Sequence, residues 1–401
     1  MAIRVGILTS GGDCPGLNAT LRGVAKALYH RMGDKVEIVG IMNGYDGLIN
    51  GNFREMSPDE FSGILTVGGT ILGTKRTPFK KMRVVEEDKV DKVAAMKKNY
   101  RAAKLDCLLC LGGNGTHKTA NLLSQEGLNI IGLPKTIDND LCGTDHCPGF
   151  GSAAKYIGTT FAELERDCHV YATKAVTIVE VMGRDAGWLT AASCLARANG
   201  AKGPDFIYLC EVPFSIDTFL KDVKAKLEEQ DAVIIAVSEG VKNKDGRYIS
   251  EEVQSSAVDS FGHSYIAGAA KVLEDAVRNE IGCKVRSIEL NLMQRCAAHL
   301  ASATDIQESR MLGKAACQYA LEGAGGMMAA VIRTSDKPYA TEFKALPVCD
   351  IANAIKSVPA DYISDAGNDV TEKMVDYLTP LIQGEMNTVY ENGIPKYIYL
   401  Y

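Results

Sequence analysis

The sequence predicts an α/β protein made of two doubly wound, three-layer α/β/α domains with mainly parallel sheets. Three observations predict this fold: apolar runs alternate with helical patterns, most of the runs lack polar alternation, and glycine-rich turns follow several of them. Strands that are apolar throughout are typical of parallel sheets covered by helices on both faces. At 401 residues the chain is too long for one compact core, so two domains are expected.

In chain order, the strand assignments rest on short apolar runs and the helix assignments on apolar residues at helical spacing. The predicted strands are Arg4–Leu8, Val36–Ile41, Leu105–Leu111, Asn129–Leu133, Ala175–Val181, Phe206–Cys210, Ala232–Val237, Val285–Leu290 and Met327–Ile332. The predicted helices are Leu17–Tyr29, Lys89–Lys104, Lys118–Glu126, Ala153–Cys168, Thr218–Glu229, Ser264–Ile281 and Val370–Ile382. A domain boundary is expected near Phe150–Gly151.

The composition excludes several classes of function. The chain has 46% hydrophobic and 23% charged residues, a net charge of −6 and no basic block, so no nucleic-acid partner is expected. No apolar run approaches the roughly 20 residues that span a bilayer, and no signal peptide is indicated. A cytoplasmic protein without a membrane partner is therefore expected. Cys107 and Cys110 have CxxC spacing, but residues three apart on a strand point to opposite faces, so no metal pair is predicted there.

Two glycine-rich turns follow predicted strands. Gly11-Gly12 resembles the start of a P-loop, but Leu17 and Asn18 stand where its Lys and Ser/Thr would be, and GxGxxG is absent. What remains is a turn whose backbone N–H groups and following helix can face a phosphate. The turn Gly112–Thr116 has the same character, since its glycines remove Cβ atoms where a ligand would approach.

A third loop, Gly68–Arg76, adds Lys75 and Arg76 as cations that can reach anionic oxygens, although a solvated surface loop is the alternative for Arg76. Because the carboxyl ends of parallel strands meet at one edge of a sheet, the turns are expected to converge there.

The stretch Pro134–Asp140 carries the residues that phosphoryl transfer to an alcohol needs. Asp138 can accept the hydroxyl proton, Asp140 can hold Mg²⁺ directly or through water, and Lys135 supplies positive charge. Thr136 can orient the acceptor. Carboxylates in a turn are also common helix caps, which is the alternative interpretation.

Further candidates follow later strands. Arg184, flanked by Gly183 and placed just after Ala175–Val181, is suited to bidentate contact with a phosphate. Glu239 offers an acceptor for sugar hydroxyls. Arg286 and Arg295 can clamp a second, remote phosphate, with ordinary surface arginines as the alternative.

Together these motifs resemble the 6-phosphofructokinase family, which transfers phosphate from ATP or pyrophosphate to the 1-hydroxyl of fructose 6-phosphate. The resemblance rests on Leu8–Asp13, Gly68–Arg76, Gly112–Thr116, Pro134–Asp140, Val179–Arg184 and Met293–Arg295.

The resemblance implies a role for each candidate residue. Asp138, Lys135 and Arg184 would be catalytic, and Asn114 and Asp140 would bind Mg²⁺. The donor would contact Gly11, Gly12, Tyr45, Lys75, Arg76, Gly113, Asn114, Gly115 and Thr116. The sugar phosphate would contact Thr136, Asp138, Met182, Gly183, Arg184, Glu239, Arg286 and Arg295.

The resemblance also implies the organisation of the chain. Residues 1–150 would form the donor-binding domain, residues 151–310 the sugar-phosphate domain, and residues 311–401 a segment that packs back across both. The active site would lie in the cleft between the domains. A homotetramer or homodimer is expected.

The phosphoryl donor depends on two positions. By resemblance, pyrophosphate users carry Asp where this chain has Gly115, and that carboxylate obstructs the α-phosphate of a nucleotide. Lys135 and the C-terminal stretch 358–371 instead resemble the pyrophosphate branch. We favour ATP because a steric block is harder to circumvent than an added cation, and pyrophosphate is the alternative.

Three departures from the family pattern favour a further alternative, a weakly catalytic or regulatory paralogue. Asn114 replaces a metal-binding Asp, Ala175 replaces an arginine that reaches a neighbouring subunit, and Leu292 replaces a His or Tyr. A lipid or NAD kinase, whose GGDG-type turn resembles Gly112–Thr116, is the remaining alternative.

Overall fold

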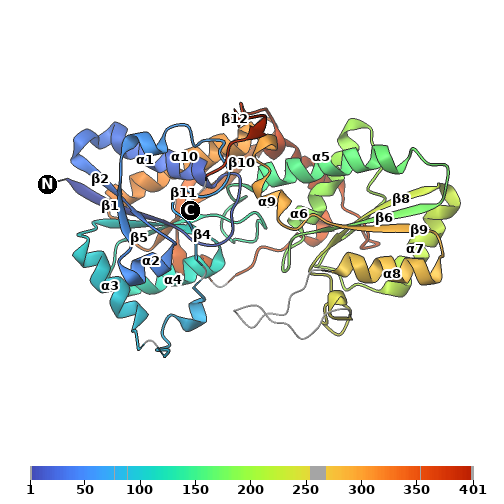
Figure 1. Cartoon of the computed structure of the whole chain (residues 1–401), viewed down its shortest axis with the longest axis horizontal. Coiled ribbons are helices and arrows are strands. Elements are labelled where there is room, and N and C mark those ends of the chain that lie inside the picture. The colour runs from blue at the N-terminus through green and yellow to red at the C-terminus, as the bar shows by residue number, and fades with distance from the viewer. Residues whose placement is uncertain (1, 76, 88, 253–267, 353, 399–401) are drawn as a thin grey trace.

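The structure, a computed structural model, describes residues 2–75, 77–87, 89–252, 268–352 and 354–398. Two sheets, each covered by helices, lie one beyond the other along the longest axis of the molecule (Figure 1). The predicted α/β class with mainly parallel sheets is confirmed.

The first sheet has seven strands in the order β11-β10-β5-β4-β1-β2-β3. Its central strands are parallel, and β3 and β11 are antiparallel edge strands. The strands are β1 (Ile3–Thr9), β2 (Val36–Ile41), β3 (Phe53–Met56), β4 (Cys107–Gly112), β5 (Ile130–Pro134), β10 (Met327–Asp336) and β11 (Tyr339–Pro347).

Helices cover both faces of this sheet because its strands are apolar on both faces. Leu109 of β4 belongs to a buried cluster with α1 (Leu17–Met32) and α10 (Ala303–Leu321). Leu108, which points the other way, belongs to a cluster with α2 (Tyr45–Asn50), α3 (Lys92–Ala102) and α4 (Asn114–Gln125). The result is a three-layer sandwich with the carboxyl ends of the parallel strands at one edge.

The second sheet has four parallel strands in the order β7-β8-β6-β9. It contains β6 (Ala175–Val181), β7 (Phe206–Tyr208), β8 (Ala232–Ser238) and β9 (Lys284–Glu289), with α5 (Phe150–Cys168), α6 (Trp188–Ala191), α7 (Ile216–Glu229) and α8 (Ala269–Glu280). The helices α7 and α8 pack on one face, and α5 packs on the other.

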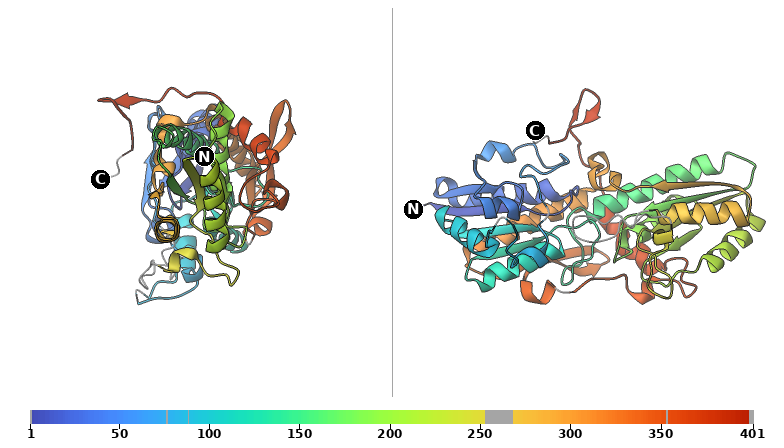
Figure 2. Two further views of the ribbon diagram at one scale, coloured as in Figure 1. Left: turned by 90° about the vertical axis from the view of Figure 1, so that its right-hand side faces the viewer. Right: turned by 60° about the horizontal axis from the view of Figure 1, so that its bottom comes forward.

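The chain then returns to the first sheet. After α9 (Met293–Cys296), helix α10 packs along α1, and β10 and β11 extend the large sheet. Helix α10 therefore spans the boundary expected at residue 310. The remaining α-helices and strands are α11 (Val348–Ile351), α12 (Glu372–Leu378), β12 (Tyr390–Glu391) and β13 (Ile394–Pro395). The last two strands form a hairpin that projects from the body of the molecule (Figure 2).

Short 3₁₀ helices complete the described elements and mostly lie in connections. They are Gly33–Lys35, Pro58–Phe61, Phe79–Lys81, Ala192–Asn199, Ile249–Glu252, Ala298–Leu300, Ala360–Tyr362 and Thr379–Ile382. No helix within the described ranges is both long and apolar enough to cross a membrane.

All nine predicted strands are present, Val36–Ile41 and Ala175–Val181 with the predicted bounds and the other seven with shifted ends. The elements that were not predicted are β3, β11, β12, β13, α2, α6, α9, α10 and α11. The edge strand β11 alternates between more and less exposed residues, so it lacks the apolar run of a central strand. Helix α10 buries Asp305, Glu308 and Ser309, which interrupt its apolar stripe. The start predicted for Ser264–Ile281 lies outside the described residues, and α8 begins at Ala269.

A buried histidine joins the loop after β5 to α10. The imidazole of His146 lies 2.8 Å from Asp145 Oδ2 through Nδ1 and 2.7 Å from Glu308 Oε2 through Nε2. Burial by itself lowers the pKa of His146, but the hydrogen bonds to these two carboxylates outweigh burial and raise the pKa to about 9. The imidazole is therefore charged in the folded protein at neutral pH.

This ion pair makes a pH-dependent contribution to stability. Because the pKa of His146 rises from 6.5 to about 9 on folding, its stabilisation is complete below about pH 6.5 and is lost as the pH rises through 9. We expect His146→Gln to lower the free energy of unfolding by about 3 kcal/mol near pH 6.5, because it removes the positive charge that faces both Glu308 and Asp145. Urea unfolding between pH 6 and 10 measures both effects. The control is His299→Gln at an exposed site, which should retain the wild-type pH dependence.

Candidate active site

A cavity of about 200 Å³ lies at the carboxyl ends of β1, β4 and β5, where ligands bind in open α/β sheets. The turns after these three strands, which are far apart in the sequence, meet there as expected. The lining residues are Gly11, Gly12, Asp13, Gly113, Asn114, Lys135, Thr136, Ile137, Asp138, Asp140 and Arg295.

The turn after β1 is held by cations on two sides. The Lys135 ammonium donates a hydrogen bond to the Gly12 carbonyl oxygen. A Cβ atom at Gly12 would lie 3.1 Å from Nη1 of Arg295, so a larger residue would displace the guanidinium. The turn therefore brings two positive charges against backbone that can face a phosphate.

Asp13 completes this turn and was not among the predicted site residues. Its Oδ2 accepts a hydrogen bond from the Gly69 amide at 2.9 Å, and its Oδ1 accepts one from the Cys14 amide at 2.9 Å. Burial raises the pKa of Asp13, although these bonds and the nearby Lys135 oppose the rise. Its position directly after a glycine pair at a strand end was the signal available in the sequence.

Asp138 is the most strongly perturbed carboxyl group of the cavity. Burial, followed by the negative charges of Asp140 and Glu239, raises its pKa to about 7, while Arg295 and Lys135 act in the opposite direction. Its Oδ1 is buried and has no hydrogen-bond partner. A carboxyl group with a pKa near neutrality and a free oxygen is suited to accept a proton from a substrate.

Three oxygens of the cavity are suited to a magnesium ion. Oδ1 of Asn114, of Asp138 and of Asp140 are all buried without a hydrogen-bond partner. Mg²⁺ prefers oxygen ligands and keeps several waters, so one or two carboxylates with phosphate oxygens suffice. The part of the chain described here contains no group of three His, Cys, Asp or Glu residues arranged for a metal. A cation in this cavity would therefore depend on the Asn114 amide, water and substrate oxygens.

The loops after β6 and β8 of the second sheet supply further candidates. Glu239 follows β8, and its Oε1 accepts a hydrogen bond from the Gly183 amide at 3.2 Å. Gly183 has φ +135°, and a Cβ there would lie 2.5 Å from the Ala186 carbonyl oxygen, so this turn requires glycine. Burial raises the pKa of Glu239, and the charges of Arg184 and Arg295 lower it.

The charge of Glu239 raises the pKa of Asp138, and the charge of Arg295 lowers that of Glu239, so the loop after β8 lies near the cavity. The predicted sugar-phosphate contacts Met182, Gly183, Arg184 and Glu239 do not themselves line the cavity. Met182 is buried and Arg184 is half-buried beside Gly183. Glu239 therefore connects the second sheet electrostatically to Asp138 and Arg295.

Two predicted donor contacts are arranged differently from the expectation. Tyr45 is buried in the core, and its hydroxyl donates to the Thr116 carbonyl oxygen at 2.9 Å, so it supports the first turn of α4 and does not face the cavity. Lys75 is exposed and pairs with Asp46 at 2.8 Å. Arg76 lies outside the described residues. Gly115 lies in the first turn of α4, between Asn114 and Thr116.

Arg286 is not brought to the cavity within this chain. It lies on β9, and its Nη1 is 3.8 Å from Asp167 Oδ2 near the end of α5, with both side chains exposed. The expected contact with a sugar phosphate is therefore absent within this one chain.

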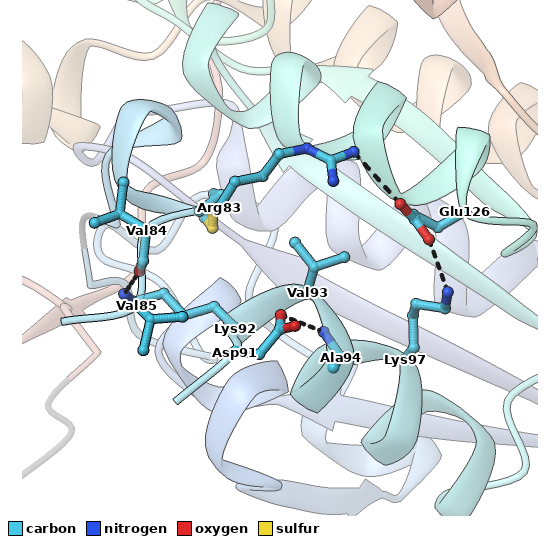
Figure 3. A pocket seen from close by; sticks show the side chains of 10 residues that line it. Arg83, Val84, Val85, Asp91, Lys92, Val93, Ala94, Lys97 and Glu126 are labelled. Atoms are coloured by element: carbon cyan, nitrogen blue, oxygen red, sulfur yellow. Dashed lines mark hydrogen bonds and ion pairs between the residues drawn. The ribbon is translucent and has the colours of Figure 1, made fainter. Parts of the chain in front are cut away.

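A second cavity, of about 220 Å³, lies beside the N-terminal half of α3 and the end of α4 (Figure 3). Its cations are paired: Lys97 and Arg83 contact Glu126 at 2.7 and 3.4 Å, and Lys92 contacts Glu86 at 2.9 Å. Asp91 caps α3 by accepting from the Ala94 amide. Because its charges are already satisfied, this cavity is a weaker candidate than the one at the strand ends.

Comparisons with known proteins agree on one family. A family model described as phosphofructokinase matches residues 4–320. The pyrophosphate–fructose 6-phosphate 1-phosphotransferase of Xanthomonas campestris is 35% identical over 98% of this chain and 94% of its own length. The ATP-dependent 6-phosphofructokinase of Spirochaeta thermophila is 38% identical over 89% of this chain and 93% of its own length.

Solved structures give the same result. The crystal structure of the pyrophosphate-dependent phosphofructokinase of Nitrosospira multiformis has a TM-score of 0.87, with 28% identity over 99% of this chain and 96% of that chain. The corresponding enzyme of Marinobacter aquaeolei has a TM-score of 0.85, with 30% identity over 98% and 95%.

The unpartnered Asn114 oxygen leads to a prediction about metal affinity. Asn114→Asp adds a negative charge to a cavity whose oxygens are suited to a divalent cation, so we expect tighter binding of Mn²⁺ by about tenfold, measured by electron paramagnetic resonance. The matched control is Asn129→Asp, because the Asn129 Oδ1 is also buried and unpartnered but lies at the opposite end of β5. Equal affinities in Asn114→Asp and the wild type would exclude Asn114 as a ligand.

Proposed function

Because this chain belongs to the phosphofructokinase family, we propose that it transfers the γ-phosphoryl group of ATP to the 1-hydroxyl of fructose 6-phosphate. The proposal rests above all on Asp138, whose free oxygen and pKa of about 7 suit a base that accepts the hydroxyl proton. Lys135 and Arg295, which border the same cavity, provide positive charge for anionic substrates.

In the proposed reaction, Asp138 takes the proton of the sugar hydroxyl as the hydroxyl oxygen bonds to the γ-phosphorus. The bond from that phosphorus to the bridging oxygen breaks, and ADP leaves with the electron pair. Lys135 and Arg184 offset the charge that spreads over the phosphoryl oxygens.

Mg²⁺, if bound in this cavity, would offset part of the negative charge of the donor phosphates. Asn114 and Asp140 are the residues that would hold it, because their Oδ1 atoms lack partners in the cavity. The backbone after β1 and β4 would bind the donor phosphates through its N–H groups.

The sugar phosphate would bind toward the second sheet. Glu239 would offer a carboxylate to the sugar hydroxyls, Met182 and Gly183 would contact the sugar phosphate from the same side, and Thr136 would orient the acceptor near Asp138. Arg295 would pair with the 6-phosphate. Arg286 has an exposed guanidinium away from this cavity, so we propose that it serves a neighbouring copy in a homodimer or homotetramer.

The choice of ATP is supported by the space at Gly115. A Cβ atom built there meets no other atom within 4 Å, so the first turn of α4 leaves room for the α-phosphate of a nucleotide. Pyrophosphate is the second candidate donor. Lys135 favours pyrophosphate, because an added buried cation suits a compact polyanion. Relatives of similar identity include one named for pyrophosphate and one named for ATP.

The function is tested with purified protein in a coupled assay with fructose 6-phosphate, comparing ATP with pyrophosphate. We expect turnover with ATP, and we expect Asp138→Asn to lower kcat by at least about 10³-fold because the base is lost. Asp376→Asn, at an exposed site, is the control. Near-normal turnover in Asp138→Asn would remove this residue from the mechanism, and turnover with pyrophosphate alone would reverse the donor assignment.

A second variant tests the donor. Gly115→Asp places a carboxylate in the open space of the α4 turn, so we expect kcat/KM with ATP to fall by about 100-fold, with a smaller loss for pyrophosphate. The ratio of the two kcat/KM values is the measurement. Gln125→Glu, at an exposed position near the end of the same helix, controls for the added charge. An equal loss with both donors would show that Gly115 does not select the nucleotide.

A further inference from the structure

Asn139 separates the two acidic residues of the cavity and is itself fully buried. Its φ of +56° lies in the left-handed region, which asparagine tolerates better than most residues. Asp138 and Asp140 both line the cavity, whereas Asn139 does not. The backbone turn at Asn139 therefore presents two like charges to one space.

The Asn139 amide is bound on both of its ends. Its Nδ2 donates to the Tyr377 hydroxyl at 2.9 Å. Its Oδ1 accepts from the Cys147 amide at 3.1 Å and from the Lys356 ammonium at 3.2 Å. The Tyr377 hydroxyl in turn donates to the Asp145 carbonyl oxygen at 2.7 Å. Two of these partners come from the C-terminal part of the chain.

Lys356 makes several further contacts with the loop from Asp138 to Cys147, which we call the acidic loop. Its ammonium donates to the carbonyl oxygens of Thr144 and Asp145 at 3.2 and 2.6 Å. Its backbone N–H donates to the Asp140 carbonyl oxygen at 2.8 Å, and the neighbouring Ile355 forms a β-bridge with Leu141. The loop from Asp138 to Cys147 is thus fastened to residues 354–358, a segment that we call the brace.

The brace also contacts the other two parts of the site. The Ala354 carbonyl oxygen accepts from the Asn114 side chain at 3.3 Å. The Lys356 carbonyl oxygen accepts from Trp188 Nε1 at 2.8 Å. Trp188 is the first residue of α6 and follows the loop that carries Arg184. Glu211 accepts from both the Gly187 and Val358 amides, at 2.8 and 2.9 Å. The brace therefore joins three parts of the site: the turn at Asn114 after β4, the loop from Asp138 to Cys147, and the loop after β6.

We propose that Asn139, Lys356 and Tyr377 are positioning residues that hold Asp138 and Asp140 in the geometry needed for phosphoryl transfer. This inference rests on the proposed function. Two carboxylates that line one cavity repel each other, and a loop without fixed partners would relax by moving them apart. The hydrogen bonds to Asn139 oppose that movement, and a displacement of about 1 Å can cost about 100-fold in rate.

Tyr377→Phe tests this role, with Tyr362→Phe as the matched control. Both rings pack on Trp188, with centroid distances of 5.1 and 6.3 Å, but it is the Tyr377 hydroxyl that bonds Asn139. We expect Tyr377→Phe to lower kcat by about 10- to 100-fold with KM for fructose 6-phosphate nearly unchanged. Tyr362→Phe should leave both parameters nearly unchanged.

Hydrogen–deuterium exchange provides a readout that does not depend on turnover. We expect the amides of residues 139–147, including the Cys147 amide bonded to Asn139, to exchange faster in Tyr377→Phe than in Tyr362→Phe. Lys356→Met should likewise lower kcat and speed the exchange of these amides. Lys356→Arg should keep part of kcat because it keeps a charged donor over Trp188. Thermal unfolding identifies any variant that is simply misfolded.

The outcomes separate the inference from the function on which it rests. If Tyr377→Phe matches Tyr362→Phe in kcat and in exchange, or if its kcat and KM change together in proportion to lost thermal stability, the positioning role is wrong. If Asp138→Asn keeps near-normal turnover, the proposed function fails instead. A fall in kcat without a change in KM, together with faster loop exchange in Tyr377→Phe and an inactive Asp138→Asn, supports both the positioning role and the proposed function.

Discussion

The burial of two like charges at the end of β5 is the constraint on which the rest of the structure depends. Asp138 and Asp140 share one cavity, and burial raises the pKa of both carboxyl groups. Such an arrangement is unstable unless cations and hydrogen-bond donors surround it. Lys135 and Arg295 provide positive charge near Asp138. The charge of Lys356 partly offsets the rise in the pKa of Asp140.

The fold meets this constraint by joining segments that are far apart in the chain. The parallel strands bring their carboxyl ends to one edge, and the charge of Glu239, after β8 of the second sheet, acts on Asp138. Helix α10 returns to hold His146 through Glu308, and residues 354–358 fasten the loop directly. The acidic loop is thus supported by hydrogen bonds to residues that lie 162 and 211 positions later in the chain.

Much of the site was predictable because its chemistry is concentrated in short motifs at strand ends. The apolar runs predicted the strands, and the parallel arrangement then placed Gly11, Asn114 and Asp138 at one edge. Tyr45 and Arg286 show where this reasoning stops. The burial of Tyr45 depends on its contact with α4, and the direction of Arg286 depends on the edge position of β9. Neither property is encoded in a local sequence pattern.

The sequence by itself determined the α/β class, the family resemblance and the set of residues able to perform phosphoryl transfer, because periodicity and short motifs are local properties. Only the tertiary structure decided that Asn139 is clamped by Lys356 and Tyr377, and that three buried oxygens lack partners. The reason is physical. Hydrogen bonds between residues more than 200 positions apart, and the desolvation that raises the pKa of Asp138, exist only once the chain has packed around them.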